Sequence, residues 1–181
     1  RFGVVSVNSI FHEAVGKSDF FVSELGWREF AFSSMFRLHK TLFSHQGSLL
    51  HVKQNLWEEE LKPEFKNFKF DKNNHFLEKW QKGETGEPLV DAGMKELWYT
   101  GYMHNRIRMI TASFLIKDLL LSWKEGEAWF WETLCDACPA TNPFSWQWVF
   151  GSGYDASPFF RIFNPSLQAE KFDPNAKYIN K

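Results

Sequence analysis

The sequence has few cysteines, almost no net charge and no long apolar run, and each shortage excludes a class of protein. Two cysteines among 181 residues are too few for a secreted scaffold held by disulfides, so we expect a reducing, cytoplasmic environment. The longest apolar run, residues 109–121, is broken by polar and charged side chains, which excludes a membrane-spanning helix. The 21 basic and 22 acidic residues give a formal charge of -1, and overall charge therefore points to no partner.

Metal and redox chemistry also have little support in the sequence. Cys135 and Cys138 have the C-x-x-C spacing of metal and thioredoxin-like sites, but the chain has no second pair, and the segment before them has helical spacing. The six histidines show no pairing at the spacing of metal ligands. We therefore expect no metal site, and a redox role of the two cysteines is the minor alternative.

Aromatic residues are what the chain has in excess. It contains 9 Trp, 20 Phe and 4 Tyr, which together make 18% of the sequence, while hydrophobic residues as a whole make 44%. This length and composition are typical of one globular domain with a buried core and exclude an intrinsically disordered chain. The rings exceed what packing in a domain of this size needs, so some of them are expected to have another role.

Apolar residues recur with helical spacing almost everywhere, and no segment alternates with a period of two for long enough to predict a sheet. We therefore predict an all-α fold. The predicted helices cover residues 6–14, 18–40, a segment around 76–80, 89–100, 106–123 and 124–134. The segment 44–74 is predicted to be mostly loop with one short helix, and the prolines and glycines from Pro139 onwards predict loops again.

Four segments combine charged or polar groups with large rings where simple core packing would not place them. Their sequences are ELGWREF (24–30), TGEPLVDAGM (85–94), TGYMHNRIRM (100–109), and SWQW (145–148) followed by FFRIFNP (159–165). In this order they resemble the flavin-binding helical domain of the DNA photolyase/cryptochrome family, and the similarity covers nearly the whole chain.

The resemblance implies a helical fold that binds FAD, with the reduced form of FAD active. It also implies a phosphate-binding loop and an N-terminal α/β antenna domain upstream of Arg1, whose antenna chromophore the sequence does not indicate. Residues 1–181 are therefore expected to be a partial catalytic domain, incomplete at its N-terminus and without the antenna domain. Such a chain is expected to bind flavin weakly by itself, because phosphate oxygens need donors that lie elsewhere.

By this resemblance, one group of residues surrounds the flavin. Arg108 lies beside the flavin ring, with Asp118 and Asp136 as its counter-ions, and Asn142 faces the reactive N5 atom. The full set of implied flavin contacts is Phe21, Asn105, Arg108, Asp136, Cys138, Asn142 and Trp146. A neutral amide can donate a hydrogen bond to N5 without supplying a proton, which favours repair over signalling. From the residues alone, Arg108 could instead form a salt bridge within a helical bundle, and Asn142 could be a turn residue before Pro143.

A second group matches the pocket that holds a DNA lesion flipped out of the duplex. Trp27 and Trp148 match the two indoles around the lesion, where stacking restores roughly 1–3 kcal/mol per base. Glu24 matches a residue that hydrogen-bonds the pyrimidine carbonyls. Asn105 and Met109 stand where relatives specific for the (6-4) lesion carry histidines, which indicates cyclobutane dimers. The whole set implied to contact DNA is Glu24, Trp27, Arg28, Asn105, Arg106, Met109 and Trp148, with Arg161, Lys62, Lys66, Lys69 and Lys117 as further candidates for a basic face.

The resemblance also implies a row of tryptophans that carries electrons to the flavin. Trp146 and Trp123 match its inner and middle members, while the outer position is occupied by Phe70, whose ring is much harder to oxidise. The outer step could use another ring, and the candidates are Trp80, Trp129 and Trp131. Two further departures from the family pattern are Cys138, which replaces an acid, and Tyr102, which replaces a tryptophan. The residues implied to take part in the chemistry are Trp123, Trp146, Glu24 and Asn142.

These features predict a light-driven DNA-repair enzyme, a carbon-carbon lyase that splits cyclobutane pyrimidine dimers by electron transfer from the flavin. UV-damaged DNA is the expected partner, and the protein is expected to act as a monomer in the cytoplasm or on DNA. The alternative is a cryptochrome-type blue-light receptor with the same cofactor and no repair activity. A third reading is an inactive helical fragment.

Overall fold

The structure is a computed structural model, and it describes residues 4–38, 62–153 and 155–181. Within these residues the regular structure is helical apart from one isolated bridge between Asp71 and Leu121, which confirms the all-α prediction for them. The elements are α1 (Val7–Ala14), α2 (Asp19–Leu38), the short 3-10 turn η2 (Pro63–Phe65), α4 (Asn74–Lys82), α5 (Pro88–Thr100), α6 (Asn105–Ser113), the π-helical turn η3 (Phe114–Asp118), α7 (Trp123–Thr133), α8 (Thr141–Phe150) and α9 (Pro165–Phe172). No helix in this part of the chain is long and apolar enough to cross a membrane.

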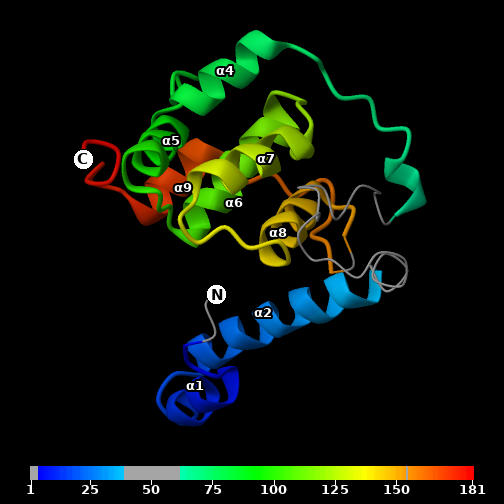
Figure 1. The fold of residues 1–181 in the computed structure, drawn as a ribbon. Helices are drawn as coiled ribbons and strands as arrows, with labels where there is room; N and C mark the ends of the chain where they lie inside the picture. Colours follow the sequence, from blue (N-terminus) through cyan, green and yellow to red (C-terminus); the bar gives the residue numbers. More distant parts are fainter. Residues whose placement is uncertain (1–3, 39–61, 154) are drawn as a thin grey trace.

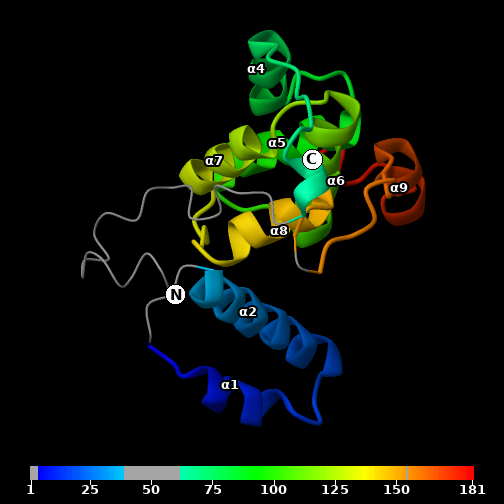
Figure 2. The ribbon, with the colours of Figure 1, turned by 90° about the vertical axis from the view of Figure 1, so that its right-hand side faces the viewer.

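The helices form two groups in space. Helices α4 to α9 make a bundle, and α1 with α2 lies below α8 in both views (Figures 1 and 2). Helix α8 packs against α2, α6 and α7, so it connects the two groups. The interior of the bundle is filled by large buried side chains, among them Trp80, Val90, Met94, Leu97, Ile110, Leu115, Trp146 and Phe150.

Serine and glycine set the ends of the helices that the sequence predicts well. Ser6 and Ser18 precede α1 and α2, and each hydroxyl accepts the main-chain N–H three residues further on, at 3.1 and 3.3 Å. Gly83 and Gly101 end α4 and α5 in the left-handed conformation, with φ of 66° and 67°. These observed ends lie close to the predicted ones.

The predicted helix 106–123 is wrong in its second half. The α-helix ends at Ser113 and passes into η3, after which Leu120 adopts the left-handed conformation with φ of 54°. The Leu120 carbonyl accepts the Asp71 amide at 2.8 Å, so a segment distant in sequence holds this bend. Ser122 then begins α7, and its hydroxyl accepts the Lys124 amide at 3.3 Å. The letters S-W-K-E at 122–125 fit the capping-box pattern, which is the signal that predicts a new helix start.

The loops predicted from Pro139 onwards are wrong in two places, because α8 and α9 occupy part of this region. Pro143 lies in the first turn of α8, where a main-chain N–H has no partner within the helix, so the proline does not break it. Pro165 takes the first position of α9, and the side-chain oxygen of Asn164 accepts the Leu167 amide at 3.0 Å.

Of the predicted loop 44–74, residues 44–61 lie outside the described residues. The remainder contains η2 and extended chain, as predicted. Phe68 and Phe70 in this part pack on Phe150, with ring centroids 5.3 Å apart in each case. The segment therefore covers the C-terminal end of α8 with aromatic rings.

Candidate functional site

Helix α8 brings together two of the residues predicted to act at the flavin. Asn142 and Trp146 are one turn apart, so their side chains share a face of the helix, and they are only 8% and 2% exposed. Helix α7 packs along α8. Gly126 of α7 permits the close approach, because a Cβ atom there would lie 2.1 Å from the Trp146 ring. The interpretation of Asn142 as a turn residue is wrong, since it is buried in the first turn of a helix.

Glu127 of α7 holds the Asn142 side chain. Asn142 Nδ2 donates to the carboxylate Oε1 of Glu127 at 2.9 Å and to the Glu127 main-chain carbonyl at 3.1 Å. An amide nitrogen carries two hydrogens, so both are used within the protein. This arrangement contradicts the predicted donation from Asn142 to a ligand and leaves the side-chain oxygen, Oδ1, to face one.

Glu127 is a functional candidate that sequence reasoning missed. It is 2% exposed, and burial raises its pKa from the ordinary 4.5 to about 7, against the opposing effect of the hydrogen bond from Asn142. A signal was available in the sequence. Positions 123, 126, 127 and 130 have the spacing of a buried helix face, and Glu127 is the one charged residue among them.

The tryptophans predicted to carry electrons are both buried. Trp123 and Trp146 are each 2% exposed, and within the described residues their rings do not contact each other. Trp146 meets Phe130 and Trp80 edge-on, with ring centroids 5.0 and 6.2 Å apart. Trp80 is fully buried, and its indole N–H donates to the Thr111 carbonyl at 3.0 Å. Trp80 therefore cannot form the surface end of an electron path.

A second pair of indoles reaches the surface. Trp129 stacks on Trp98 with ring centroids 5.8 Å apart and 5° between the planes, and Trp98 is 64% exposed. Phe70 is half-buried against Phe68, and Trp131 is half-buried as well. Trp129 thus has an exposed aromatic neighbour, which Trp80 lacks.

Arg108 of α6 is half-buried and is fixed by two contacts. Its Nε donates to the Met103 carbonyl at 2.7 Å, and its Nη2 pairs with the Asp136 carboxylate at 3.0 Å. The predicted ion pair with Asp136 is confirmed. The predicted pair with Asp118 is not among the ion pairs of the described residues. Burial and the nearby Glu87 instead raise the pKa of Asp118.

The residues of α2 predicted to contact the lesion, Glu24 and Trp27, and the predicted flavin contact Phe21 lie at the surface. Glu24 is exposed, and Phe21 and Trp27 are each 46% exposed. Phe30 of the same helix packs edge-on against Phe144 of α8, with ring centroids 5.6 Å apart. This aromatic contact places α2, with its predicted lesion and flavin residues, beside the helix that carries Asn142 and Trp146.

Each of the three arginines predicted to contact DNA lies over an aromatic ring. The Arg106 guanidinium lies 4.0 Å from the Phe172 centroid, and that of Arg28 lies 5.1 Å from the Phe32 centroid. Arg161 lies 5.6 Å from the centroid of Trp148. Arg161 also lies 4.9 Å from the Phe163 ring, which neighbours Trp148 at 6.1 Å. The remaining predicted residues of α6 are Asn105, which is exposed, and Met109, which is half-buried against the core.

Two of the lysines predicted for a basic face are tied to the protein instead. Lys117 donates to the carbonyls of Phe150 and Phe159, and burial lowers its pKa from 10.5 to about 8. Lys62 donates to the Gly151 carbonyl at 3.1 Å. These contacts hold the chain after α8 in place. Lys66 and Lys69 are exposed, and their place on a basic face stays a prediction.

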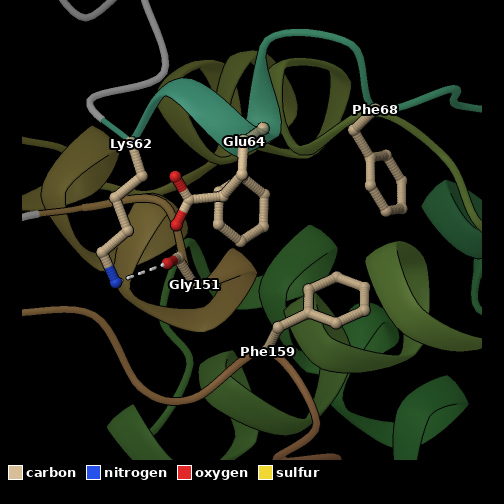
Figure 3. Close-up of a pocket in the computed structure, with 6 residues that line it drawn as sticks. Lys62, Glu64, Phe68, Gly151 and Phe159 are labelled. Atoms are coloured by element: carbon tan, nitrogen blue, oxygen red, sulfur yellow. Dashed lines mark hydrogen bonds between the residues drawn. The ribbon is translucent and has the colours of Figure 1, made fainter.

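An aromatic pocket of about 390 Å³ lies beside Lys62, one of the lysines predicted for a basic face (Figure 3). Its lining is Lys62, Glu64, Phe65, Phe68, Gly151 and Phe159. None of these was predicted to contact flavin, and the pocket adjoins the C-terminal end of α8 at Gly151, whereas Asn142 lies at the other end of that helix.

Two residues of the four sequence segments, and Cys138 outside them, make contacts that stabilise turns and helix ends. The Asp91 carboxylate accepts the main-chain amides of Thr85 and Gly86 at 2.8 and 3.0 Å, which fixes the turn before α5. The ring nitrogen Nδ1 of His104 accepts the Arg106 amide at 3.2 Å and caps α6. Cys138 is a half-buried free thiol, and its carbonyl accepts the Asn142 amide at 3.1 Å at the start of α8.

The residues present fit a flavin. The Arg108 guanidinium retains partial exposure beside Asp136 and suits an electron-rich ring, and the buried Asn142 offers an acceptor oxygen. The half-exposed rings of α2 are suitable neighbours for a planar heterocycle. The fold and these residues therefore define a helical flavin-binding domain.

The comparison with known proteins identifies the family. The sequence profile of the FAD-binding domain of DNA photolyase matches residues 21–181, and the chain belongs to this family. It is 43% identical to a deoxyribodipyrimidine photo-lyase of Agrobacterium fabrum over 187 residues, which cover 99% of this chain and 36% of that protein.

Two solved structures show the same fold. An archaeal photolyase from Sulfolobus tokodaii with two FAD molecules matches with a TM-score of 0.81 and 37% identity, over 98% of this chain and 37% of that one. A cryptochrome of Synechocystis sp. PCC6803 matches with a TM-score of 0.78 and 33% identity, over 97% and 35%. The chain spans about a third of the length of these relatives.

Proposed function

We propose that this chain carries the catalytic flavin site of a light-driven DNA-repair enzyme that splits cyclobutane pyrimidine dimers in UV-damaged DNA. The observation that carries the proposal is the shared face of α8, where the buried Asn142 and Trp146 lie one turn apart in a domain of the photolyase family. The reaction is that of a carbon-carbon lyase, and the enzyme acts on DNA as a monomer.

The residues around α8 have separate roles in this proposal. Bound reduced FAD supplies the light-driven electron. Arg108, held by Asp136, keeps a positive charge beside the flavin, and Asn142 contacts its ring edge. Trp146 lies in an apolar surrounding of Phe130 and Trp80 that excludes water from the electron path. The other implied contacts are Phe21, Asn105 and Cys138.

The lesion is held between α2 and the end of α8. Trp27 and Trp148 stack on the flipped bases, and Glu24 hydrogen-bonds their carbonyl groups. Arg161 lies over Trp148 and stiffens this wall, while Arg28 and Arg106 reach the phosphates. Asn105 and Met109 complete the pocket.

A cryptochrome-type blue-light receptor is the second candidate function. The similarity to the Synechocystis cryptochrome and to cryptochrome-2 of Arabidopsis thaliana favours it, as does Phe70 in place of an outer tryptophan. The two functions share the flavin and differ in the repair of DNA, so one assay separates them.

The deciding experiment is a repair assay. The chain is loaded with excess FAD, reduced, mixed with UV-irradiated oligo-dT and illuminated, and the absorbance of restored thymines is followed. Recovery that needs both light and protein is the expected result. Bound flavin without recovery favours the receptor, and the absence of flavin binding favours an inactive helical fragment.

A matched pair of tryptophan variants tests the lesion wall. Trp148→Ala should weaken binding of damaged DNA by roughly tenfold while FAD affinity stays nearly constant, because one stacking surface for the flipped base is lost. Trp98→Ala removes an exposed indole outside the proposed pocket and should change neither. A large loss of FAD in Trp148→Ala would show that this indole supports the flavin and not the lesion.

A further inference from the structure

The segment 159–163, which follows α8, is held at both ends by the end of α6 and the turn η3. The Lys117 ammonium of η3 donates to the Phe159 carbonyl and lies 4.1 Å from the centroid of the Phe159 ring. The Ser113 hydroxyl, on the last residue of α6, accepts the Phe163 amide at 3.1 Å. The partners are four residues apart on each side and pair in opposite order. The segment therefore runs antiparallel to one turn of chain and is clamped at two points.

Both points of this clamp use polar groups that are removed from water. Ser113 is fully buried and Phe163 is 5% exposed, so without the hydroxyl the Phe163 amide would lose its acceptor inside the protein. Lys117 is half-buried and also donates to the carbonyl of Phe150, the last residue of α8, at 3.3 Å. Hydrogen bonds from a charged donor are stronger than those between neutral groups. One ammonium group thus ties the segment to η3 and to the end of α8.

The residue in the middle of the clamped segment is Arg161. Its guanidinium lies 5.6 Å from the centroid of Trp148 and 4.9 Å from that of Phe163, and its main-chain N–H donates to the Pro158 carbonyl at 2.9 Å. An exposed arginine side chain has many rotamers, so its place over a ring depends on where its main chain is held. The two clamp points, two residues before and two residues after Arg161, fix that main chain.

We propose that Ser113 and Lys117 are positioning residues that hold Arg161 over Trp148 and thereby make DNA binding selective for a damaged site. This inference rests on the proposed function, in which Trp148 stacks on a flipped base. A wall that is already held in its binding geometry loses little conformational freedom when the base arrives. Undamaged DNA is held through its phosphates and does not use this wall. The clamp therefore contributes to the difference between the two affinities.

Four variants of the full chain test the proposal. Lys117→Met removes the ammonium group at similar side-chain length, whereas Lys117→Arg keeps a charged donor. Ser113→Ala removes the acceptor of the Phe163 amide. Lys82→Met is the matched control, because Lys82 is an exposed lysine of α4 that has no part in the proposed lesion wall. Thermal unfolding of each variant separates loss of the fold from loss of the clamp.

The first measurement needs neither flavin nor DNA. Nuclear magnetic resonance follows hydrogen exchange of the main-chain amides of Arg161 and Phe163, which are both hydrogen-bonded. We expect exchange faster by roughly tenfold in Lys117→Met and Ser113→Ala, because the segment opens more often. Exchange should stay slow in Lys117→Arg and Lys82→Met. Unchanged exchange in a folded Lys117→Met chain would overturn the clamp.

The second measurement is damage selectivity, the ratio of the affinities for UV-irradiated and undamaged oligo-dT in the chain saturated with FAD. Loss of one positive charge weakens both DNAs alike, so the ratio is not changed by charge alone. The ratio should fall roughly fivefold in Lys117→Met and Ser113→Ala, a part of what stacking on one ring contributes. It should be retained in Lys117→Arg and Lys82→Met. An unchanged ratio in a Lys117→Met chain with fast exchange would refute the positioning role.

A double variant shows whether Lys117 acts through Arg161. In a chain that already carries Arg161→Met, the further change Lys117→Met should leave the ratio as it is, because the side chain that the clamp positions is gone. A further fall as large as that in the unmodified background would contradict the inference. A ratio near one in the unmodified chain contradicts the proposed function instead, while the exchange experiment still decides whether the clamp exists.

Discussion

Helix α2 and the pair α7–α8 both carry many aromatic residues, but they place them in opposite surroundings. On α2, the rings of Phe20, Phe21 and Trp27 are 77%, 46% and 46% exposed. Phe20 and Trp27 are seven residues apart and lie on one side of the helix, while Phe21 lies on an adjoining side. On α7 and α8, Phe130 and Trp146 are each 2% exposed. A helix that is apolar on all sides is normally buried. The aromatic excess of the sequence therefore divides into rings that pack the interior and rings that remain accessible to a ligand.

The largest expected effect comes from removing a ring that packs the interior. Trp146→Ala should lower the free energy of unfolding by about 3–5 kcal/mol, because it leaves a cavity beside Phe130 and Trp80. Trp27→Ala should change it by less than about 1 kcal/mol, since the ring is half exposed, yet it should weaken binding of damaged DNA. Urea unfolding and DNA titration measure the two effects. Equal destabilisation by both variants would contradict the division.

The second prediction concerns the pH dependence of stability. The pKa of Glu127 is raised from 4.5 to about 7 in the folded chain, so the folded state holds a proton that the unfolded state releases. Stability should therefore fall as pH rises from about 4.5 through 7, by on the order of 3 kcal/mol from this group. Glu127→Gln lacks this titration and should be the more stable protein at pH 8 and equal at pH 4.5. If the free energies of unfolding of the two proteins changed in parallel with pH across this range, the raised pKa of Glu127 would be ruled out.

The third prediction compares a glycine in each region. Gly126→Ala should destabilise the chain by about 1–3 kcal/mol, because the new methyl group overlaps Trp146 and Leu115. A methyl group added at Gly26 in α2 would meet no atom within 4 Å, and Gly26→Ala should stabilise the chain by about 0.5–1 kcal/mol through helix propensity. Thermal unfolding of both variants measures these two changes in stability. A stabilising Gly126→Ala would show that α7 and α8 are not closely packed.

The smallest expected effect concerns a surface ion pair of α2. Arg28 and Glu29 are paired at 3.2 Å, with side chains 37% and 56% exposed, so Glu29→Gln should change the free energy of unfolding by less than about 1 kcal/mol. It should strengthen DNA binding slightly, because Arg28 is released and a negative charge is removed. A salt titration of DNA affinity tests this. Weaker binding by Glu29→Gln would argue against α2 as a DNA-facing helix.

The same two regions show what the sequence could predict. The extent of α2 followed from the capping Ser18 and from local propensity, because the helix depends on few distant contacts. The break at Leu120 depends on a hydrogen bond from Asp71, and no local pattern contains that contact. The start of α7 at Ser122 had a local signal, the capping box, that periodicity alone obscured.

The candidate site divides in a similar way. The residues of the site were identified from sequence motifs, and the pairing of Arg108 with Asp136 was predicted correctly. The orientation of Asn142 was predicted wrongly because Glu127, on another helix, decides it. Lys117 was placed on a basic face, whereas main-chain carbonyls of Phe150 and Phe159 hold it. Positions of this kind depend on tertiary contacts, which periodicity and motifs do not specify.

The most direct test of the account is time-resolved absorption on the chain saturated with FAD. The central claim is that the buried Trp146 lies next to the flavin on α8 and gives it an electron. Light should produce a tryptophan radical signal in the unmodified chain, and Trp146→Phe should abolish most of it while FAD occupancy is retained. An undiminished radical signal in Trp146→Phe with bound FAD would contradict the claim.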